Sequence, residues 1–221
     1  MSFWDWLFPN YACLICKDEL NAHQNLHICD KCAQGLPINN QSVTLADKSA
    51  HQWFDKSFSA FIYEEPICSL ILALKYNNHG QVAKFIAPYM AGAILREGAV
   101  DKDTILIPVP LCKKRYKRRG YNQAELLARE VAIYIGCSVD KNILERIKVT
   151  SVQKNMNVKQ RQENLDGAFA VNNCANVQCN NFILVDDVFT SGSTVNECAK
   201  ALKEAGAGQV DALVCARVGM Q

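Results

Sequence analysis

The sequence predicts an α/β protein, in which helices flank a parallel β-sheet and a small four-cysteine module precedes it. Two observations carry this prediction. The segment 182–217 contains two apolar runs joined by a turn and an amphipathic stretch, a pattern typical of a strand–helix–strand unit with parallel strands. Near the N-terminus, four cysteines stand in two CxxC pairs, a spacing typical of metal sites.

Composition narrows the class of protein further. The chain has 221 residues, of which 49% are apolar, enough for one ordinary domain with a packed core and a small appendage. Its apolar stretches are interrupted well before the roughly 20 residues that a membrane helix needs. The start, MSFWDWLFPN, lacks the basic region and cleavage site of a signal peptide. We therefore expect no membrane span and a cytoplasmic location.

Three segments are expected along the chain: an N-terminal segment with the cysteine module at 1–40, a polar linker at 41–52, and an α/β domain at 53–221. Apolar periodicity and Pro or Gly boundaries predict the elements of that domain. In order they are a strand at 58–63, a helix at 66–76, a helix at 82–97 bent or restarted at Pro88, a strand at 103–110, a helix from 122 to Gly136, and the strand–helix–strand unit.

The cysteine module has the spacing of a zinc ribbon, CxxC, twelve residues, CxxC. Four thiolates complete a tetrahedral shell with no open position, so the expected zinc is structural and stabilises a segment too short to build a core. His23 and His27 lie between the pairs, but four cysteines need no further ligand. The predicted ligands are Cys13, Cys16, Cys29 and Cys32.

The segment LVDDVFTSGST (184–194) predicts a phosphate-binding loop. Hydroxyl residues and Gly192 precede a helix, whose N-terminus attracts anions through its free N–H groups. Carboxylates repel phosphate, so Asp186 and Asp187 would instead bind ribose hydroxyls or a magnesium ion of the same ligand. The alternative is a simple helix cap beside surface acids. A Walker loop and a GxGxxG motif are excluded, because neither pattern is present.

Beyond this loop, several segments are similar to the ComF family, which belongs to the type I phosphoribosyltransferase superfamily and has an N-terminal zinc-binding module. The segments that carry the resemblance are LVDDVFTSGST, PVPLCKKRYKRRGYNQAELLA (108–128), LKY (74–76), RQENLDGAF (161–169) and CAR (215–217), together with the cysteines. The resemblance implies a phosphoribosyltransferase-like sheet, and magnesium bound together with 5-phosphoribosyl diphosphate.

The resemblance also implies roles for individual residues. Asp186 and Asp187 would hold the ribose hydroxyls, and the loop would hold the 5-phosphate. Purine-salvage members of the superfamily have an Asp at the place of Thr190, so purine salvage is not favoured and the simplest general base is missing. The full set expected to bind this ligand is Asp186, Asp187, Val188, Phe189, Thr190, Ser191, Gly192, Ser193, Thr194 and Arg115.

A basic segment follows the strand at 103–110, where six of the seven residues from Lys113 to Arg119 are cationic. We predict a flexible turn whose Arg115, Arg118 and Arg119 stabilise the leaving diphosphate, with Arg118 and Arg119 catalytic alongside the two acids. An alternative is a single-stranded nucleic-acid surface, because Tyr116 and Tyr121 stand among the cations. A solvated basic turn is the third interpretation.

Two functions remain open at this stage. One is a transferase that moves the phosphoribosyl group to an unknown acceptor, with Arg161 as a weaker candidate near the acceptor. The other is a non-catalytic nucleic-acid handling or adaptor protein, whose ribosyl-phosphate site senses a ligand or a DNA 5-phosphate end. The resemblance implies a role in DNA uptake and natural transformation, with single-stranded DNA, a competence helicase and a recombination mediator as partners. The sequence does not fix the oligomeric state.

Overall fold

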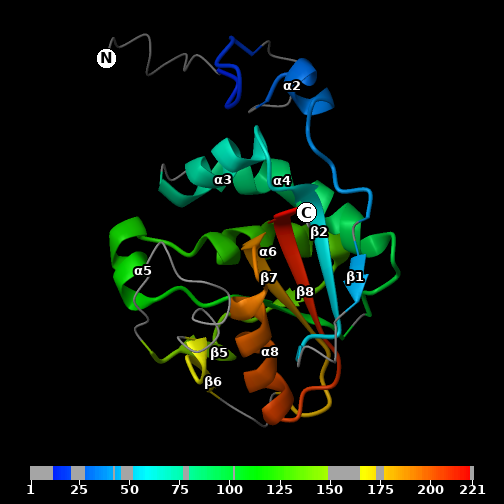
Figure 1. The fold of residues 1–221 in the computed structure, drawn as a ribbon, viewed down its shortest axis with the longest axis vertical. Helices are drawn as coiled ribbons and strands as arrows, with labels where there is room; N and C mark the ends of the chain where they lie inside the picture. The colour runs from blue at the N-terminus through cyan, green and yellow to red at the C-terminus, as the bar shows by residue number, and fades with distance from the viewer. Residues whose placement is uncertain are drawn as a thin grey trace.

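The computed structural model describes residues 12–20, 28–41, 43–45, 52–76, 80–101, 103–148, 165–172 and 177–219. They form a six-stranded sheet with helices around it, and a separate two-stranded sheet (Figure 1). Five strands of the large sheet are parallel and one edge strand is antiparallel, which confirms the predicted class. In spatial order the strands are β1 (Val43–Leu45), β2 (Lys56–Ile62), β8 (Val210–Arg217), β7 (Phe182–Phe189), β3 (Ile105–Pro108) and β4 (Ser138–Val139).

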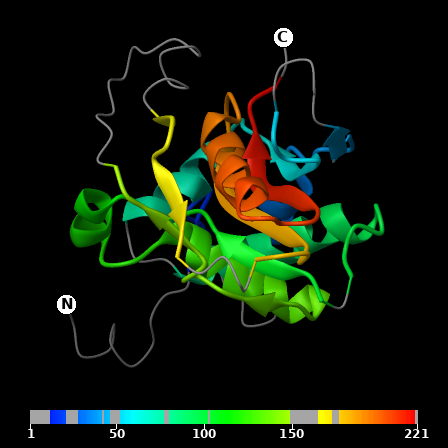
Figure 2. The same cartoon turned by 90° about the horizontal axis from the view of Figure 1, so that it is seen from below.

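Helices cover both faces of this sheet (Figure 2). One face packs against α3 (Ile67–Tyr76), α4 (Gly80–Leu95) and α6 (Gln123–Ile135). The other packs against α8 (Ser193–Glu204) and the two-stranded sheet of β5 (Leu144–Arg146) and β6 (Phe169–Val171). Because both faces are buried, the central strands are nearly continuous apolar runs. Within the described residues, no helix has the length and apolarity needed to cross a bilayer.

The connections after β3 and β7 run in opposite directions across the sheet. From β3 the chain passes through α6 to β4 at one edge, whereas from β7 it passes through α8 to β8 on the other side. Adjacent parallel strands whose connections diverge in this way leave a crevice at their carboxyl ends, where open α/β sheets bind ligands. The candidate site lies at this point of the sheet.

The basic segment takes a different form from the one predicted. Residues Lys113–Arg119 form the helix α5 instead of a flexible turn, because Lys, Arg and Tyr tolerate helix well and Gly120 ends it in a left-handed conformation at φ 80°. The helix predicted at 82–97 is α4, a single helix that contains Pro88 and does not restart there, and buried residues on both sides of Pro88 hold it against the core.

The N-terminal segment is joined to the domain by packing and by a strand. Residues 43–45, inside the stretch predicted as a linker, form β1 and pair with β2. This triplet, Val-Thr-Leu, favours a strand but is too short to predict within polar surroundings. Cys13, Ile28 and Leu36 belong to the same buried cluster as residues of α3 and α4. The short helix α2 (Asp30–Gln34) lies above these two helices in Figure 1.

Candidate functional site

The strand β7 carries the two acids of the site to opposite faces of the sheet, because side chains alternate along a strand. Leu184 belongs to the buried cluster under α8, and Val185 belongs to the cluster under α3, α4 and α6. By the same alternation, Asp186 lies on the α8 face and Asp187 on the α3 face. The strand runs on to Phe189, so both acids lie in the last four residues of the strand and not in the loop.

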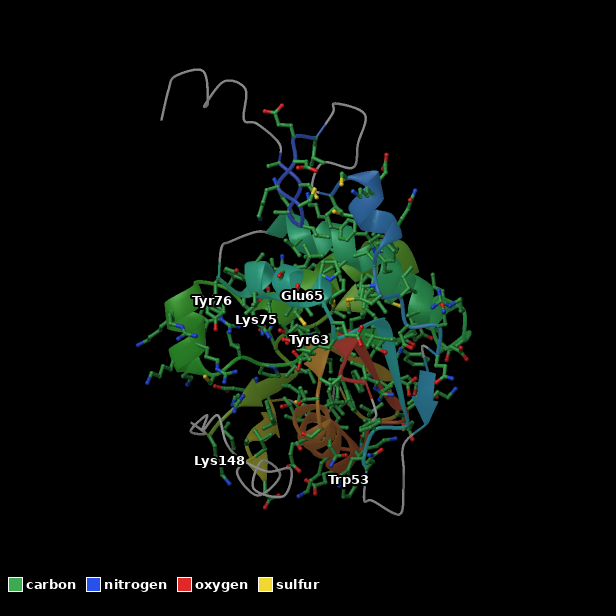
Figure 3. All side chains as sticks on the ribbon, turned by 45° about the horizontal axis from the view of Figure 1, so that its top comes forward. Trp53, Tyr63, Glu65, Lys75, Tyr76 and Lys148 are labelled. Atoms are coloured by element: carbon green, nitrogen blue, oxygen red, sulfur yellow. The ribbon has the colours of Figure 1, made fainter. Side chains whose placement is uncertain are left out.

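Lys75 neutralises one of these acids. Its Nζ lies 2.5 Å from Oδ2 of Asp187, whose side chain is only 8% exposed. Lys75 is near the C-terminal end of α3, where the helix dipole favours a cation. It stands beside Tyr76 at the end of α3 that faces α5 (Figure 3). The buried carboxylate of Asp187 therefore has a counter-ion from a different element.

Asp186 is held in a less favourable setting for an anion. Burial raises the pKa of this carboxyl well above its ordinary value, and the neighbouring charge of Asp187 raises it further. The backbone N–H of Asp187 donates a hydrogen bond of 2.8 Å to Oδ1 of Asp186, which opposes that effect in part. A hydroxyl donor or a divalent cation from a ligand would stabilise the ionised form.

The loop after β7 makes a tight turn over an aromatic ring. Gly192 is the N-cap of α8 and has φ 72°, and a Cβ at this position would lie 2.5 Å from Cζ of Phe189. The Phe189 ring is fixed by Phe54, at 5.9 Å between centroids, and by the Arg217 guanidinium, 4.7 Å from the ring centroid. The chain can therefore turn here only at glycine, and the turn presents the first N–H groups of α8 outward.

Two hydroxyl groups of the loop contact each other, since Oγ of Ser191 and Oγ of Ser193 are 2.8 Å apart. Thr190 and Thr194, at the two ends of the loop, line the cavity described next. Backbone N–H donors and small hydroxyls around a helix N-terminus are the groups that bind phosphate in other proteins. The loop has the chemistry expected of a phosphate site.

A cavity of about 240 Å³ opens at the carboxyl ends of β3 and β7, where their connections diverge. It contains both acids and four cationic side chains, so its described lining has a surplus of positive charge. The lining residues are Lys75, Val109, Pro110, Leu111, Arg115, Arg119, Gln123, Arg146, Asp186, Asp187, Val188, Thr190 and Thr194.

The structure separates the three arginines predicted at the basic segment. Arg115 and Arg119 are one helical turn apart on α5 and both line the cavity. Arg118 is exposed and does not line it; its guanidinium lies 5.5 Å from the centre of the Tyr76 ring. Arg119 lies 5.2 Å from the same ring and donates a hydrogen bond of 2.8 Å to Gln123. The half-buried Tyr121 is tied to α3, because its hydroxyl donates a hydrogen bond to the carbonyl of Leu74.

Sequence reasoning missed three polar residues of the cavity: Lys75, Gln123 and Arg146. Lys75 and Gln123 lie in segments that carry the family resemblance, LKY and 108–128, which was the available signal. Arg146 belongs to β5 and packs over the ring of Phe169 on β6, with 5.4 Å between its Cζ and the ring centroid. No local motif connects Arg146 with the loop after β7. Arg161, the weaker candidate near the acceptor, lies outside the described residues.

The four cysteines of the N-terminal module come together as predicted. Their sulfur atoms all lie within 4.8 Å of one another, and those of Cys16 and Cys29 are 3.7 Å apart. A tetrahedral zinc with bonds of about 2.3 Å requires sulfur atoms roughly 3.8 Å apart. Backbone N–H groups, led by that of Cys29, outweigh burial and lower the pKa of Cys13 to about 6, which favours the thiolate that metals bind. His23 and His27 lie outside the described residues.

Comparisons with known proteins identify the family of the chain. A family model described as the phosphoribosyl transferase domain matches residues 116–220, which include β7, the loop and α8. Competence protein F of Haemophilus influenzae is 30% identical over 230 residues, covering 95% of this chain and 98% of that protein. The DNA utilization protein YhgH of Salmonella typhi is 30% identical over 203 residues, covering 90% and 86%. Competence protein ComFC of Bacillus subtilis is 24% identical over 204 residues, covering 88% and 79%.

The first prediction concerns Gly192. We expect Gly192→Ala to lower the free energy of unfolding by roughly 3 kcal/mol, because the left-handed backbone and the overlap with Phe189 both penalise a Cβ. Gly136→Ala is the matched control, since Gly136 also has positive φ but a Cβ there would meet nothing within 4 Å. This control should cost only about 1 kcal/mol. Urea denaturation measures both, and equal losses would show that the Phe189 contact does not constrain the loop.

The second prediction concerns Asp186 and pH. The raised pKa means that the folded protein keeps this proton at a pH where the unfolded chain, with a carboxyl pKa of about 3.9, has lost it. The stabilising contribution is therefore complete below about pH 4 and is lost as pH rises through the folded-state pKa. Asp186→Asn avoids that loss, so in EDTA and without ligand it should gain stability relative to wild type as pH rises above about 4.

Denaturant titrations at several pH values measure this difference. Asp166→Asn is the control of opposite sign, because Lys200 lowers the pKa of Asp166 and the ionised form is the stabilising one. That variant should lose stability relative to wild type as pH rises, by a small amount because the pair is exposed. A difference between Asp186→Asn and wild type that does not change with pH would contradict the prediction.

Proposed function

Because the chain belongs to the family of competence protein F and the DNA utilization protein YhgH, and contains a phosphoribosyl transferase domain, we propose that it binds 5-phosphoribosyl diphosphate with magnesium at the carboxyl end of β7. We further propose that it acts in DNA uptake and natural transformation, where it handles single-stranded DNA. One observation carries the ligand assignment: two acids at the end of a buried strand lead directly into a phosphate loop, inside one cationic cavity.

Each part of this ligand has a matching group in the cavity. The loop Thr190–Thr194 would bind the 5-phosphate through backbone N–H groups and hydroxyls. Asp186 and Asp187 would accept hydrogen bonds from the ribose hydroxyls, directly or through magnesium. The diphosphate would lie toward Lys75 and Arg119, which belong to different helices but line the same cavity. The ligand is strongly anionic, which fits a lining with four cations and two acids.

The residues present fit a magnesium ion bound together with this ligand. Carboxylate oxygens are the protein ligands that magnesium prefers, and it is commonly held by one or two carboxylates plus substrate phosphates. Asp186 and Asp187 are the carboxylates that would hold it. When bound, magnesium would neutralise part of the charge that develops on the diphosphate.

In a transferase reaction, the bond between C1 of the ribose and the diphosphate oxygen breaks, and the diphosphate keeps the electron pair. A lone pair of the acceptor forms the new bond to C1 from the opposite side, and the acceptor releases its proton to water. The protein's main task is to stabilise the leaving diphosphate and the cationic ribose in the transition state. Lys75 and Arg119 suit the first of these charges, and the two acids suit the second.

A specific observation favours the alternative, a non-catalytic nucleic-acid handling role. Tyr76 and Tyr116 are 56% and 48% exposed, and Arg118 lies over the ring of Tyr76. Exposed aromatic rings among cations bind single strands by stacking and charge. In this alternative the cavity would sense a ribosyl phosphate or the 5-phosphate end of DNA. A competence helicase and a recombination mediator are the protein partners that the family role suggests.

We also propose that the four cysteines bind one structural zinc. All four positions of a tetrahedral ion would be filled by sulfur, which leaves no place for a substrate. The module contributes Cys13, Ile28 and Leu36 to the cluster that includes α3 and α4. Zinc would therefore stabilise the surface on which these helices pack.

The third prediction tests zinc. We expect about one zinc per chain in purified protein by mass spectrometry of the metal, and less than a tenth of that in the double variant Cys13→Ser with Cys16→Ser. The double variant should also unfold at lower temperature. Cys68→Ser with Cys179→Ser removes two thiols outside the cluster and should leave both values unchanged. Wild-type stability in the Cys13 and Cys16 variant would contradict the assignment.

The fourth prediction tests the ligand. Calorimetric titration of 5-phosphoribosyl diphosphate with magnesium should show binding to wild type, and at least 100-fold weaker binding to Asp186→Asn with Asp187→Asn, since several charge-assisted contacts are lost. Glu97→Gln with Glu204→Gln removes the same charge from exposed positions away from the cavity and should bind as wild type does.

Circular dichroism checks that each variant is folded. If wild type itself does not bind, the ligand assignment is wrong and single-stranded DNA becomes the ligand to test. A DNA-binding surface would show a steep decrease of affinity with salt. Release of diphosphate with an acceptor would separate a transferase from a sensor.

A further inference from the structure

Arg217 is the last residue of β8 and stands opposite Phe189, the residue before the phosphate loop. It belongs to the CAR segment, one of the segments that resemble the ComF family. Its guanidinium lies 4.7 Å from the centroid of the Phe189 ring. Arg217 is not among the described residues that line the cavity. It is therefore placed to act on the loop through this ring and not through direct contact with a ligand.

Hydrogen bonds on both sides of β8 hold Arg217 in this position. Toward β7, the N–H of Val218 donates to the carbonyl of Phe189 at 3.1 Å. Toward β2, the N–H of Tyr63 donates to the carbonyl of Arg217 at 2.7 Å. The guanidinium of Arg217 donates a hydrogen bond of 2.9 Å to Oγ of Ser57, a residue that is only 2% exposed. Both the backbone and the side chain of Arg217 are thus fixed, so its cation stays over the ring.

The ring of Phe189 in turn supports the turn of the loop. Its atoms Cζ, Cε1 and Cε2 lie 2.5, 3.0 and 3.2 Å from the place that a Cβ on Gly192 would take, so the backbone of Gly192 lies against the tip of the ring. Phe54 packs edge-on against the same ring, at an interplanar angle of 87°. The contact with Arg217 adds the attraction between a cation and an aromatic face. A ring that lost this contact would no longer fix the position of Gly192.

The position of Gly192 matters because the loop binds phosphate through donors whose direction must be correct. Hydrogen bonds weaken steeply when donor and acceptor are misaligned. A displacement of about 1 Å at a binding group can cost roughly 100-fold in rate. The diphosphate depends on other elements, since Lys75 belongs to α3 and Arg119 to α5. A poorly supported loop would therefore weaken the contacts at one end of the ligand and leave those at the other end intact.

We propose that Arg217 is a positioning residue of the phosphate loop, which holds the Phe189 ring against Gly192 and so directs the N–H donors at the start of α8. The consequence for ligand binding rests on the proposed function, because it needs the loop to bind a 5-phosphate. The structural part does not rest on it, since Arg217 supports the ring in the absence of any ligand. The two parts have separate tests.

A double-mutant cycle on the full chain tests the structural part without ligand. Gly192→Ala is costly because the new methyl group overlaps the Phe189 ring, so a ring freed by Arg217→Met should move aside and reduce that cost. We expect the loss of unfolding free energy caused by Gly192→Ala to be smaller by roughly a third or more in the Arg217→Met background than in wild type. Urea denaturation of the four proteins measures this coupling.

Gly136→Ala is the control for this cycle, because a Cβ on Gly136 would meet nothing within 4 Å. Its cost should be the same in both backgrounds. Equal costs of Gly192→Ala in the two backgrounds would refute the proposal. If Arg217→Met does not fold, Ser57→Ala takes its place. It removes the hydroxyl that accepts from Arg217 and should give the same coupling at a smaller size.

Calorimetric titrations test the consequence for ligand binding. The three ligands are 5-phosphoribosyl diphosphate with magnesium, ribose 5-phosphate, and diphosphate with magnesium. We expect Arg217→Met to weaken binding of the first two roughly tenfold, because both need the loop. Binding of diphosphate should stay within about twofold of wild type, because its contacts are independent of the loop. Arg129→Met removes an exposed arginine that pairs with Glu125 on α6, and it should change none of the three affinities.

Two results of these titrations would overturn the role of Arg217 in ligand binding. One is an unchanged affinity of Arg217→Met for 5-phosphoribosyl diphosphate. The other is an equal loss of affinity for ribose 5-phosphate and for diphosphate, which would indicate general damage to the site. If wild type itself binds neither 5-phosphoribosyl diphosphate nor ribose 5-phosphate, the proposed function fails instead. The cycle of Arg217 with Gly192 then decides alone whether Arg217 positions the loop.

Discussion

Parallel pairing of β3 with β7 is the constraint on which the site depends. Because the chain leaves these neighbouring strands in opposite directions, no connection closes the sheet edge between them. The segments that follow the two strands then supply the groups of the cavity: α5 after β3, and the phosphate loop after β7. Asn122 links the start of α6 to the residue after β3. Its side chain caps α6 by accepting from the N–H of Ala124, and it donates to the carbonyl of Val109. A different strand order would place the same residues at separate edges.

The buried position of the acids has an energetic cost that the fold only partly offsets. Lys75 compensates Asp187, but Asp186 keeps a raised pKa because of its burial and the neighbouring charge of Asp187. Such an arrangement lowers stability in the absence of ligand, and groups that bind a ligand often carry this penalty. The sheet tolerates it because the rest of β7 is fully apolar and packed on both sides.

The sequence was informative where structure is local. The unit from Phe182 to Arg217 could be predicted because its strand, turn and helix follow one another, and the turn chemistry at Gly192 is visible in the residues themselves. The cysteine cluster could be predicted for the same reason. Gly136 likewise ends α6 in a left-handed conformation, as its place after an amphipathic stretch predicted.

The contributions that come from distant elements could not be predicted. Lys75 and Arg146 reach the cavity from α3 and β5, and only the tertiary fold brings them to β7. The helical phase of α5 decided which arginines face inward: Arg115 and Arg119 do, and Arg118 does not. A run of like charges resembles a solvated turn in the sequence, so neither the helix nor the direction of each arginine could be predicted from it. The roles of these residues toward a ligand stay predictions.

Because the basic segment Lys113–Arg119 is a formed helix, it affects how quickly an anion reaches the cavity. The helix places Lys113, Lys114 and Lys117 in solvent beside the entrance, while its inner face already points at the cavity. The field of such a helix draws anions inward before contact. The rate of capture should then fall as ionic strength rises. Counter-ions in the surrounding solution would set the rate at which this protein meets its ligands.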